Sequence, residues 1–216
     1  MKRIPLFACV FPLFFLLGSC LGISMDISLN QNGSGTIALE YQISKSLDSL
    51  GKLDGNERWN TIPVGKADFE RSIDRLPDMK LVSFSSREDK QNVTITAKME
   101  FSSIQGLLAF LDASGRHSSF SGEAPSGRLL LTLADGAERK NPDLDKLIAD
   151  ISESYHIKMS MSFPGEGNLA VFNSQNALHS AIPGSEIKAQ GKKVSCSFPL
   201  NEVLCSSDGI KVEFRW

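Results

Sequence analysis

The residue best suited to a covalent modification is Cys20, which ends the run Leu17-Gly18-Ser19-Cys20. Two basic residues and then an almost wholly apolar segment at 4–17 lead directly into this run. A charged start, an apolar core and small residues before a cleavage site are typical of an export signal. We therefore expect residues 1–19 to be a signal peptide and residues 20–216 to form a single extracytoplasmic domain.

The sequence around Cys20 resembles the lipobox of bacterial lipoproteins, in which small residues precede a cysteine. The resemblance implies that the Cys20 thiol receives a diacylglycerol, that the signal is cut before it, and that the new amine is acylated. Three acyl chains anchor firmly, since each buried CH₂ contributes about 0.8 kcal/mol. The alternatives are an ordinary secretory signal with an incidental cysteine and an uncleaved membrane helix. A membrane helix needs about 20 apolar residues, whereas polar sequence begins by Ser24. We expect a protein anchored by lipid to a membrane of the bacterial cell envelope, on the periplasmic side.

Two further cysteines, Cys196 and Cys205, lie near the end of the chain. In an oxidising compartment they are candidates for a disulfide that closes a short loop. The alternative is a pair of buried free thiols that pack as small hydrophobic side chains. A zinc site is disfavoured, because neither cysteine has a second Cys or His at ligand spacing.

The three histidines, His117, His156 and His179, give little sign of catalysis. We expect His156 to be a structural histidine with satisfied hydrogen bonds, whereas His117 lies in a Ser-rich loop and carries a minor hypothesis of hydrolase activity. The chain has no Gly-x-Ser-x-Gly elbow and no glycine-rich phosphate or dinucleotide fingerprint. We therefore predict a protein that is not an enzyme and that carries no cofactor and no metal.

Alternation of apolar and polar residues dominates the rest of the chain, which indicates strands with one buried and one solvated face. The clearest case is 92–101, where Val93, Ile95, Ala97, Met99 and Phe101 share one face. We pair this strand with 80–87, and we expect an N-terminal hairpin whose strands include 25–29 and 37–41. Further strands are expected at 128–134, 157–163, 186–190, 193–198 and 210–216.

Helices are expected at 46–50, 66–76, 103–113 and from Asn141 to Tyr155. The last begins with Asn141-Pro142, a favourable cap and first turn, and continues with an apolar stripe at helical spacing. Mixed strands and helices with mostly antiparallel pairing predict an α+β fold in two layers: a mostly antiparallel sheet with amphipathic helices packed on one face.

The chain between the predicted lipid and the first strand is very short, because the strand pattern starts by Ser24. At about 3.3 Å per extended residue, residues 21–23 span only about 10 Å. We therefore expect the domain to lie against the bilayer. An apolar space between helices and sheet would then suit an acyl chain or a glycolipid.

The domain loosely resembles the LppM-like family of bacterial lipoproteins. The resemblance rests on a lipid cysteine followed at once by a Met-Asp-Ile-Ser-Leu strand at 25–29, on the Gly-Ser-Gly turn at 33–35, and on the closing strand at 209–216. It implies an envelope lipoprotein with an α+β domain that binds a lipid or glycolipid and is not an enzyme.

Two functional hypotheses follow. In the first, the domain is a non-catalytic, membrane-anchored protein that binds a lipid or glycolipid in an apolar space. In the second, it is an envelope scaffold that recruits a protein partner and holds no small molecule. Nucleic acid is not an expected partner, because the formal net charge is −2 and the basic residues are scattered.

Overall fold

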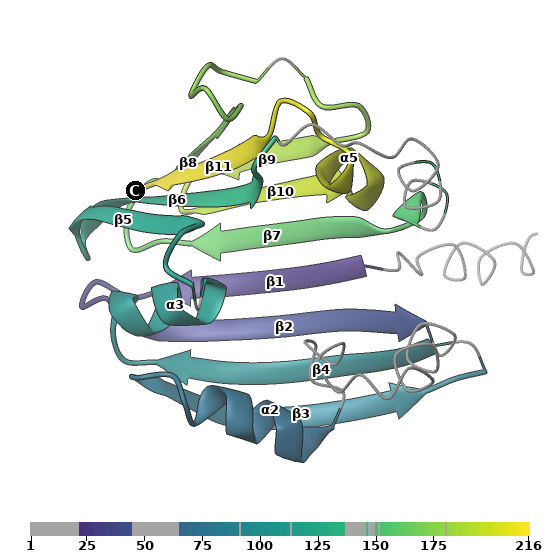
Figure 1. The fold of residues 1–216 in the computed structure, drawn as a ribbon. Helices are drawn as coiled ribbons and strands as arrows, with labels where there is room; N and C mark the ends of the chain where they lie inside the picture. The colour runs from purple at the N-terminus through teal and green to yellow at the C-terminus, as the bar shows by residue number, and fades with distance from the viewer. Residues whose placement is uncertain are drawn as a thin grey trace, which may run out of the picture.

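The computed structural model describes residues 22–44, 65–90, 92–112, 114–136, 146, 150, 152–179 and 181–216. Its main element is a seven-stranded sheet in the order β3-β4-β2-β1-β7-β10-β9 (Figure 1). Every neighbouring pair is antiparallel except β1 with β7, which run parallel. The strands are β3 (Met79–Glu88), β4 (Asn92–Phe101), β2 (Gly35–Ser44), β1 (Gly22–Leu29), β7 (His156–Ser162), β10 (Lys193–Pro199) and β9 (Glu186–Gln190).

One face of this sheet, here called the inner face, carries the core. The clearest row crosses five neighbouring strands: Met99, Ile37, Ile27, Met161 and Val194 are consecutive register partners. All five side chains are fully buried. Burial of such a side chain contributes about 1.5–3 kcal/mol, so this row fixes the register of the whole sheet: a slip of one residue would expose it.

A second sheet covers part of the inner face. It has the order β5-β6-β11-β8, and Figure 1 shows it in front of the β7, β10 and β9 side of the larger sheet. Its strands are β5 (Ser118–Glu123), β6 (Ser126–Ala134), β11 (Ile210–Arg215) and β8 (Asn168–Phe172), all paired antiparallel. Val212 and Phe214 are fully buried, and Trp216 stacks on Phe163 with ring centroids 4.9 Å apart. The two sheets therefore share one core.

Short helices cover another part of the inner face. In α2 (Lys66–Ile73), the buried Phe69 packs against Phe84 of β3 with ring centroids 5.5 Å apart. The helix α3 (Ile104–Leu111) is capped at its N-terminus by Ser103, whose Oγ accepts a hydrogen bond from the backbone N–H of Gly106. A single-turn helix, α5 (Leu200–Leu204), follows β10.

The expected α+β fold with helices packed on one sheet face is wrong. Of the described residues, 53% are strand and 15% helix, and a second sheet provides much of the cover that we had assigned to helices. The error has a physical cause: alternation with period two shows that a strand has one buried face, but it does not show to which sheet the strand belongs. The Ser-rich segment at His117, which we expected to be a loop, leads directly into β5, and β8 was not predicted.

Most of the other strands and helices that we expected are present in the structure. The structure confirms the N-terminal hairpin, the pairing of 80–87 with 92–101, and every other expected strand. The helices expected at 66–76 and 103–113 are present as α2 and α3. The helix expected at 46–50 lies outside the described residues, and so does most of the helix expected from Asn141. Within the described residues, no helix is both long enough and apolar enough to cross a membrane.

Candidate functional site

Burial of the inner face falls steadily towards one end of the seven-stranded sheet. In β1, Leu29 and Ile27 are buried, Met25 is half-buried and Ile23 is 37% exposed. The same trend runs along β7, where Met161 is fully buried and Ile157 is half-buried. We call this end, where β1 and β7 begin and β2 ends, the anchor end, because it is nearest in sequence to Cys20.

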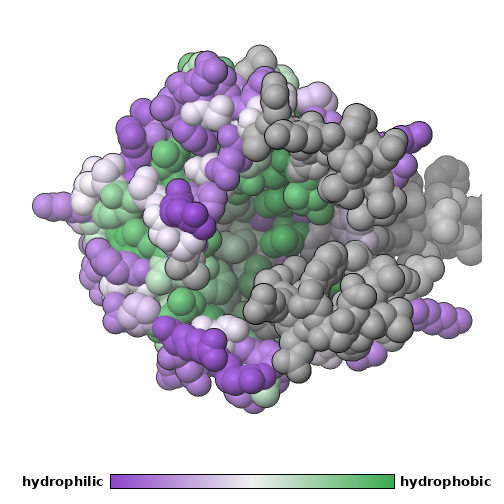
Figure 2. Space-filling view, in the orientation of Figure 1, coloured by the Kyte–Doolittle hydropathy of each residue, from purple (hydrophilic) through white to green (hydrophobic). Residues whose placement is uncertain are grey.

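The half-buried apolar side chains of the anchor end are neighbours across the sheet. Ile23 pairs with Tyr41 of β2 on one side and with Ile157 of β7 on the other, and Ile43 follows Tyr41 on the same face. Burial raises the pKa of the Tyr41 hydroxyl well above its usual range. Figure 2 shows hydrophobic side chains gathered around the middle of this face of the molecule. The inner face thus offers an apolar surface that the described residues only partly cover.

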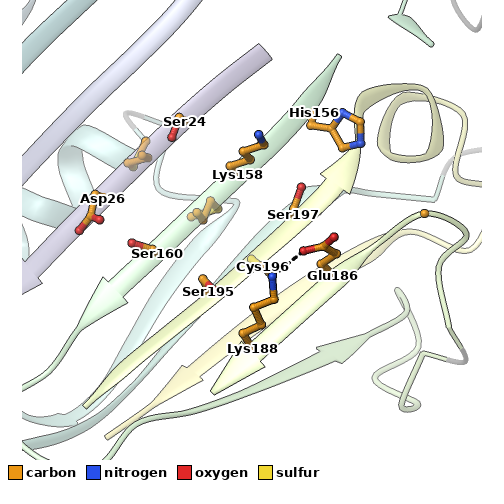
Figure 3. A pocket seen from close by; sticks show the side chains of 13 residues that line it. Ser24, Asp26, His156, Lys158, Ser160, Glu186, Lys188, Ser195, Cys196 and Ser197 are labelled. Carbon is orange, nitrogen blue, oxygen red and sulfur yellow. Dashed lines mark hydrogen bonds and ion pairs between the residues drawn. The ribbon is translucent and has the colours of Figure 1, made fainter. Parts of the chain in front are cut away.

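The opposite, outer face of the same strands carries a groove of about 370 Å³ with both polar and apolar lining (Figure 3). The serine and charged side chains that line it come from β1, β7, β10 and β9, and they alternate with the core residues of those strands. They are Ser24, Asp26, His156, Lys158, Ser160, Glu186, Lys188, Ser195 and Ser197.

The acidic side chains of this groove are already paired. Lys188 Nζ lies 2.8 Å from Glu186 Oε2, and Lys193 Nζ lies 2.9 Å from Asp26 Oδ2. Lys158 forms no ion pair with a described residue. The hydrogen bond and charge of Lys188 lower the pKa of Glu186, and the charges of Lys158 and His156 lower it further. The ionised form of Glu186 is therefore favoured by the basic side chains around it.

Two polar atoms in the groove lack a partner. His156 Nδ1 and Ser160 Oγ are buried, and neither forms a hydrogen bond with any described residue. The expectation that His156 has its hydrogen bonds satisfied is therefore wrong for Nδ1. The groove was not predicted from the sequence. The alternating polar residues at 156–162 and 195–197 indicate a polar face on each strand, but they do not indicate the register that brings these faces together.

The catalytic candidate His117 lies just before β5. Its Nδ1 lies 3.5 Å from Asp135 Oδ1, and its backbone N–H donates a hydrogen bond to Asp112. Among the hydrogen bonds of the described residues, none joins the His117 ring to a serine hydroxyl. The arrangement is a partly exposed His–Asp pair, and hydrolase activity stays an untested hypothesis.

The two remaining cysteines are free thiols in this structure. Cys196 is buried on the inner face of β10, and burial raises the pKa of its thiol to about 12. Cys205 follows α5 and is partly exposed. A disulfide between them under oxidising conditions stays a prediction.

The structure and the comparisons leave the anchoring hypothesis open. Cys20 lies outside the described residues. No protein-family model matches the chain, and no curated protein matches it. In the described part of the chain, no group of three or more His, Cys, Asp or Glu side chains is arranged to hold a metal ion. The signal peptide, the lipid on Cys20 and the resemblance to the LppM-like family stay predictions.

Proposed function

We propose that this chain is a non-catalytic lipoprotein of the bacterial cell envelope, anchored through lipid on Cys20, that binds the acyl portion of a lipid or glycolipid against its inner face. The observation that carries the proposal is the gradient of burial towards the anchor end. The described residues cover the apolar face of the sheet only in part at this end, so they leave room there for an apolar ligand.

The chemistry of the anchor end suits an acyl chain. Ile23, Met25, Ile43 and Ile157 supply aliphatic surface, and methionine adapts its shape to irregular apolar ligands. Each CH₂ group that leaves water contributes about 0.8 kcal/mol. Micromolar affinity needs about 8 kcal/mol beyond an association cost of at least about 4 kcal/mol, so about fifteen buried methylenes, the length of a common acyl chain, are required.

The position of this surface relative to the membrane supports the same function. Only Leu21 separates Cys20 from the first residue of β1. A lipid on Cys20 would therefore hold the anchor end close to the bilayer, where an amphiphile can pass between bilayer and protein. The apolar surface and its supply of ligand would lie at the same end of the molecule.

The proposal is tested with a pair of variants on neighbouring residues of β2. Ile43 lies on the inner face and Gln42 on the outer face, and both are half-buried, so Ile43→Glu places a carboxylate on the proposed lipid surface and Gln42→Glu places it on the opposite face. Both are made in residues 21–216, which retain all described strands. Binding of a fluorescent fatty-acid analogue should weaken at least about tenfold in Ile43→Glu and stay unchanged in Gln42→Glu.

Equal binding by the two variants would contradict the proposal, and so would a wild-type protein that does not bind the analogue at all. Circular dichroism spectra check that both variants are folded. Because both substitutions lie near the end of β2, any local fraying affects them alike.

A second candidate function is recruitment of a protein partner, as in an envelope scaffold. It is favoured by β9, an edge strand in which all five residues are exposed, including Ile187 at 48%. An uncovered edge strand can pair with a strand of another chain. A partner crosslinked through a photoreactive residue at position 187 in intact cells, together with a lipid-free protein, would favour this function over lipid binding.

A further inference from the structure

We propose that the outer-face groove is a phosphate-binding site centred on Lys158. The ligand class is a phosphate monoester or diester, presented either by a lipid headgroup or by a soluble compound. The site is distinct from the proposed acyl surface, because the two lie on opposite faces of β1 and β7.

The register places hydroxyl groups on both sides of the Lys158 ammonium. Ser24 of β1 and Ser197 of β10 are its direct register partners, and Figure 3 shows all three side chains on the same face. An ammonium flanked by hydroxyl donors matches a phosphate group, which presents several acceptor oxygens and negative charge.

The unpartnered polar atoms point to the same ligand chemistry. Ser160 Oγ and His156 Nδ1 lack hydrogen-bond partners among the described residues, and both residues line the groove with Lys158. A buried polar atom without a partner costs free energy. A ligand oxygen or a water held by that ligand would supply a partner for Ser160.

The charges around Lys158 favour an anion. Facing it from the neighbouring strands are the acidic Asp26 and Glu186 and the basic Lys188. Each carboxylate already has a lysine partner, Asp26 in Lys193 and Glu186 in Lys188. Lys158 forms no ion pair with a described residue, and its charge acts on Glu186 only from a distance, so its ammonium is available to a ligand.

The location also suits a headgroup, since Ser24 follows Cys20 by four residues. At about 3.3 Å per residue, the two are at most about 13 Å apart along the chain. A lipid-anchored protein would hold the groove within reach of the headgroup layer.

The first experiment is titration of the full-length lipoprotein, in micelles of an uncharged detergent, with inorganic phosphate. Amide resonances are followed by NMR, with chloride at matched ionic strength as the blank. We expect saturable shifts in β1, β7 and β10 that chloride does not produce. Lys158→Gln should raise the dissociation constant about tenfold, which corresponds to about 1.4 kcal/mol.

The matched control is Lys80→Gln in β3, which removes an exposed lysine from the outer face of the edge strand, four strands away from β7. It should leave the phosphate affinity unchanged. Ser197→Ala provides a second test that keeps the charge and should also weaken binding. Equal affinities for wild type, Lys158→Gln and Ser197→Ala would overturn the proposal.

The second experiment separates the two sources of phosphate. Amide hydrogen exchange is compared for the lipoprotein in nanodiscs of phosphatidylcholine and of phosphatidylglycerol. Slower exchange of β7 and β10 with phosphatidylglycerol, lost in Lys158→Gln, assigns a lipid headgroup. Saturable phosphate shifts with equal exchange in both bilayers assign a soluble phosphate compound. If neither the exchange difference nor the phosphate shifts are seen, the proposal is overturned. The acyl-binding function is judged separately, by the inner-face variants.

Discussion

Glu213 of β11 is a buried carboxylate held by two arginines, and its replacement by glutamine should destabilise the fold. Its side chain is 4% exposed. Arg128 Nε lies 2.9 Å from Oε2, and Arg215 Nε donates to Oε1. In Glu213→Gln the charge is lost, and the new amide nitrogen must face one of the two guanidinium donors.

The expected magnitude follows from the exposure of the three groups. Removal of one partner from a fully buried ion pair costs about 3–5 kcal/mol. Here the two arginines are 53% and 56% exposed, so water can solvate them once the carboxylate is gone. We therefore expect a loss of about 2 kcal/mol in the free energy of unfolding, above the value of up to about 1 kcal/mol for exposed pairs.

Urea unfolding of residues 21–216 measures this loss. With a slope of about 2 kcal/mol per molar urea, the midpoint should fall by about 1 M in Glu213→Gln. The control is Glu186→Gln, which breaks the exposed pair with Lys188 and should leave the midpoint unchanged. A midpoint of Glu213→Gln within error of wild type would refute the reasoning, and so would an equal effect of the two substitutions.

Three further predictions concern single residues. Because burial raises the pKa of Cys196 to about 12, iodoacetamide at pH 8 should label Cys205 in the reduced native protein long before Cys196; equal labelling by mass spectrometry would contradict this. Hydrogen bonds from the Ser114 hydroxyl and from backbone N–H groups lower the pKa of Asp112, so its contribution to stability is complete above about pH 4 and is lost on acidification. Between pH 5 and pH 2, the unfolding midpoint of Asp112→Asn should therefore fall less than that of the wild type. Parallel plots of midpoint against pH for the two proteins would contradict this prediction. A Cβ on Gly35 would lie 2.0 Å from a backbone oxygen of β1, so Gly35→Ala should cost about 1–3 kcal/mol in thermal unfolding, whereas Gly165→Ala, with open space around it, should cost little; similar losses would disprove the clash.

Much of the strand content could be predicted from the sequence, because alternation is a local signal. The strand at 92–101 is an example: its buried and exposed residues alternate in the structure as they do in the sequence. Two strands and the single-turn helix α5 could not be predicted. The edge strand β5 has mostly exposed residues, so it lacks an apolar phase, and β8 has only five residues.

The arrangement of the strands in space was beyond the sequence. The parallel pairing of β1 with β7 joins segments separated by more than a hundred residues, and no local pattern encodes it. That pairing places Ser24 beside Lys158 and so creates the outer-face groove. The apolar residues of the anchor end were identified as strand residues, but their partial exposure depends on how the second sheet and the helices cover them.

The central claim, that the inner face holds an acyl chain, is tested most directly by native mass spectrometry of residues 21–216, produced without lipidation and purified without detergent. Solvent extraction then identifies what was bound. The account predicts a discrete added mass that extracts as a lipid and is absent from Ile43→Glu. An apoprotein mass that stays unchanged after incubation with envelope lipids would contradict it and would favour the protein-recruiting scaffold.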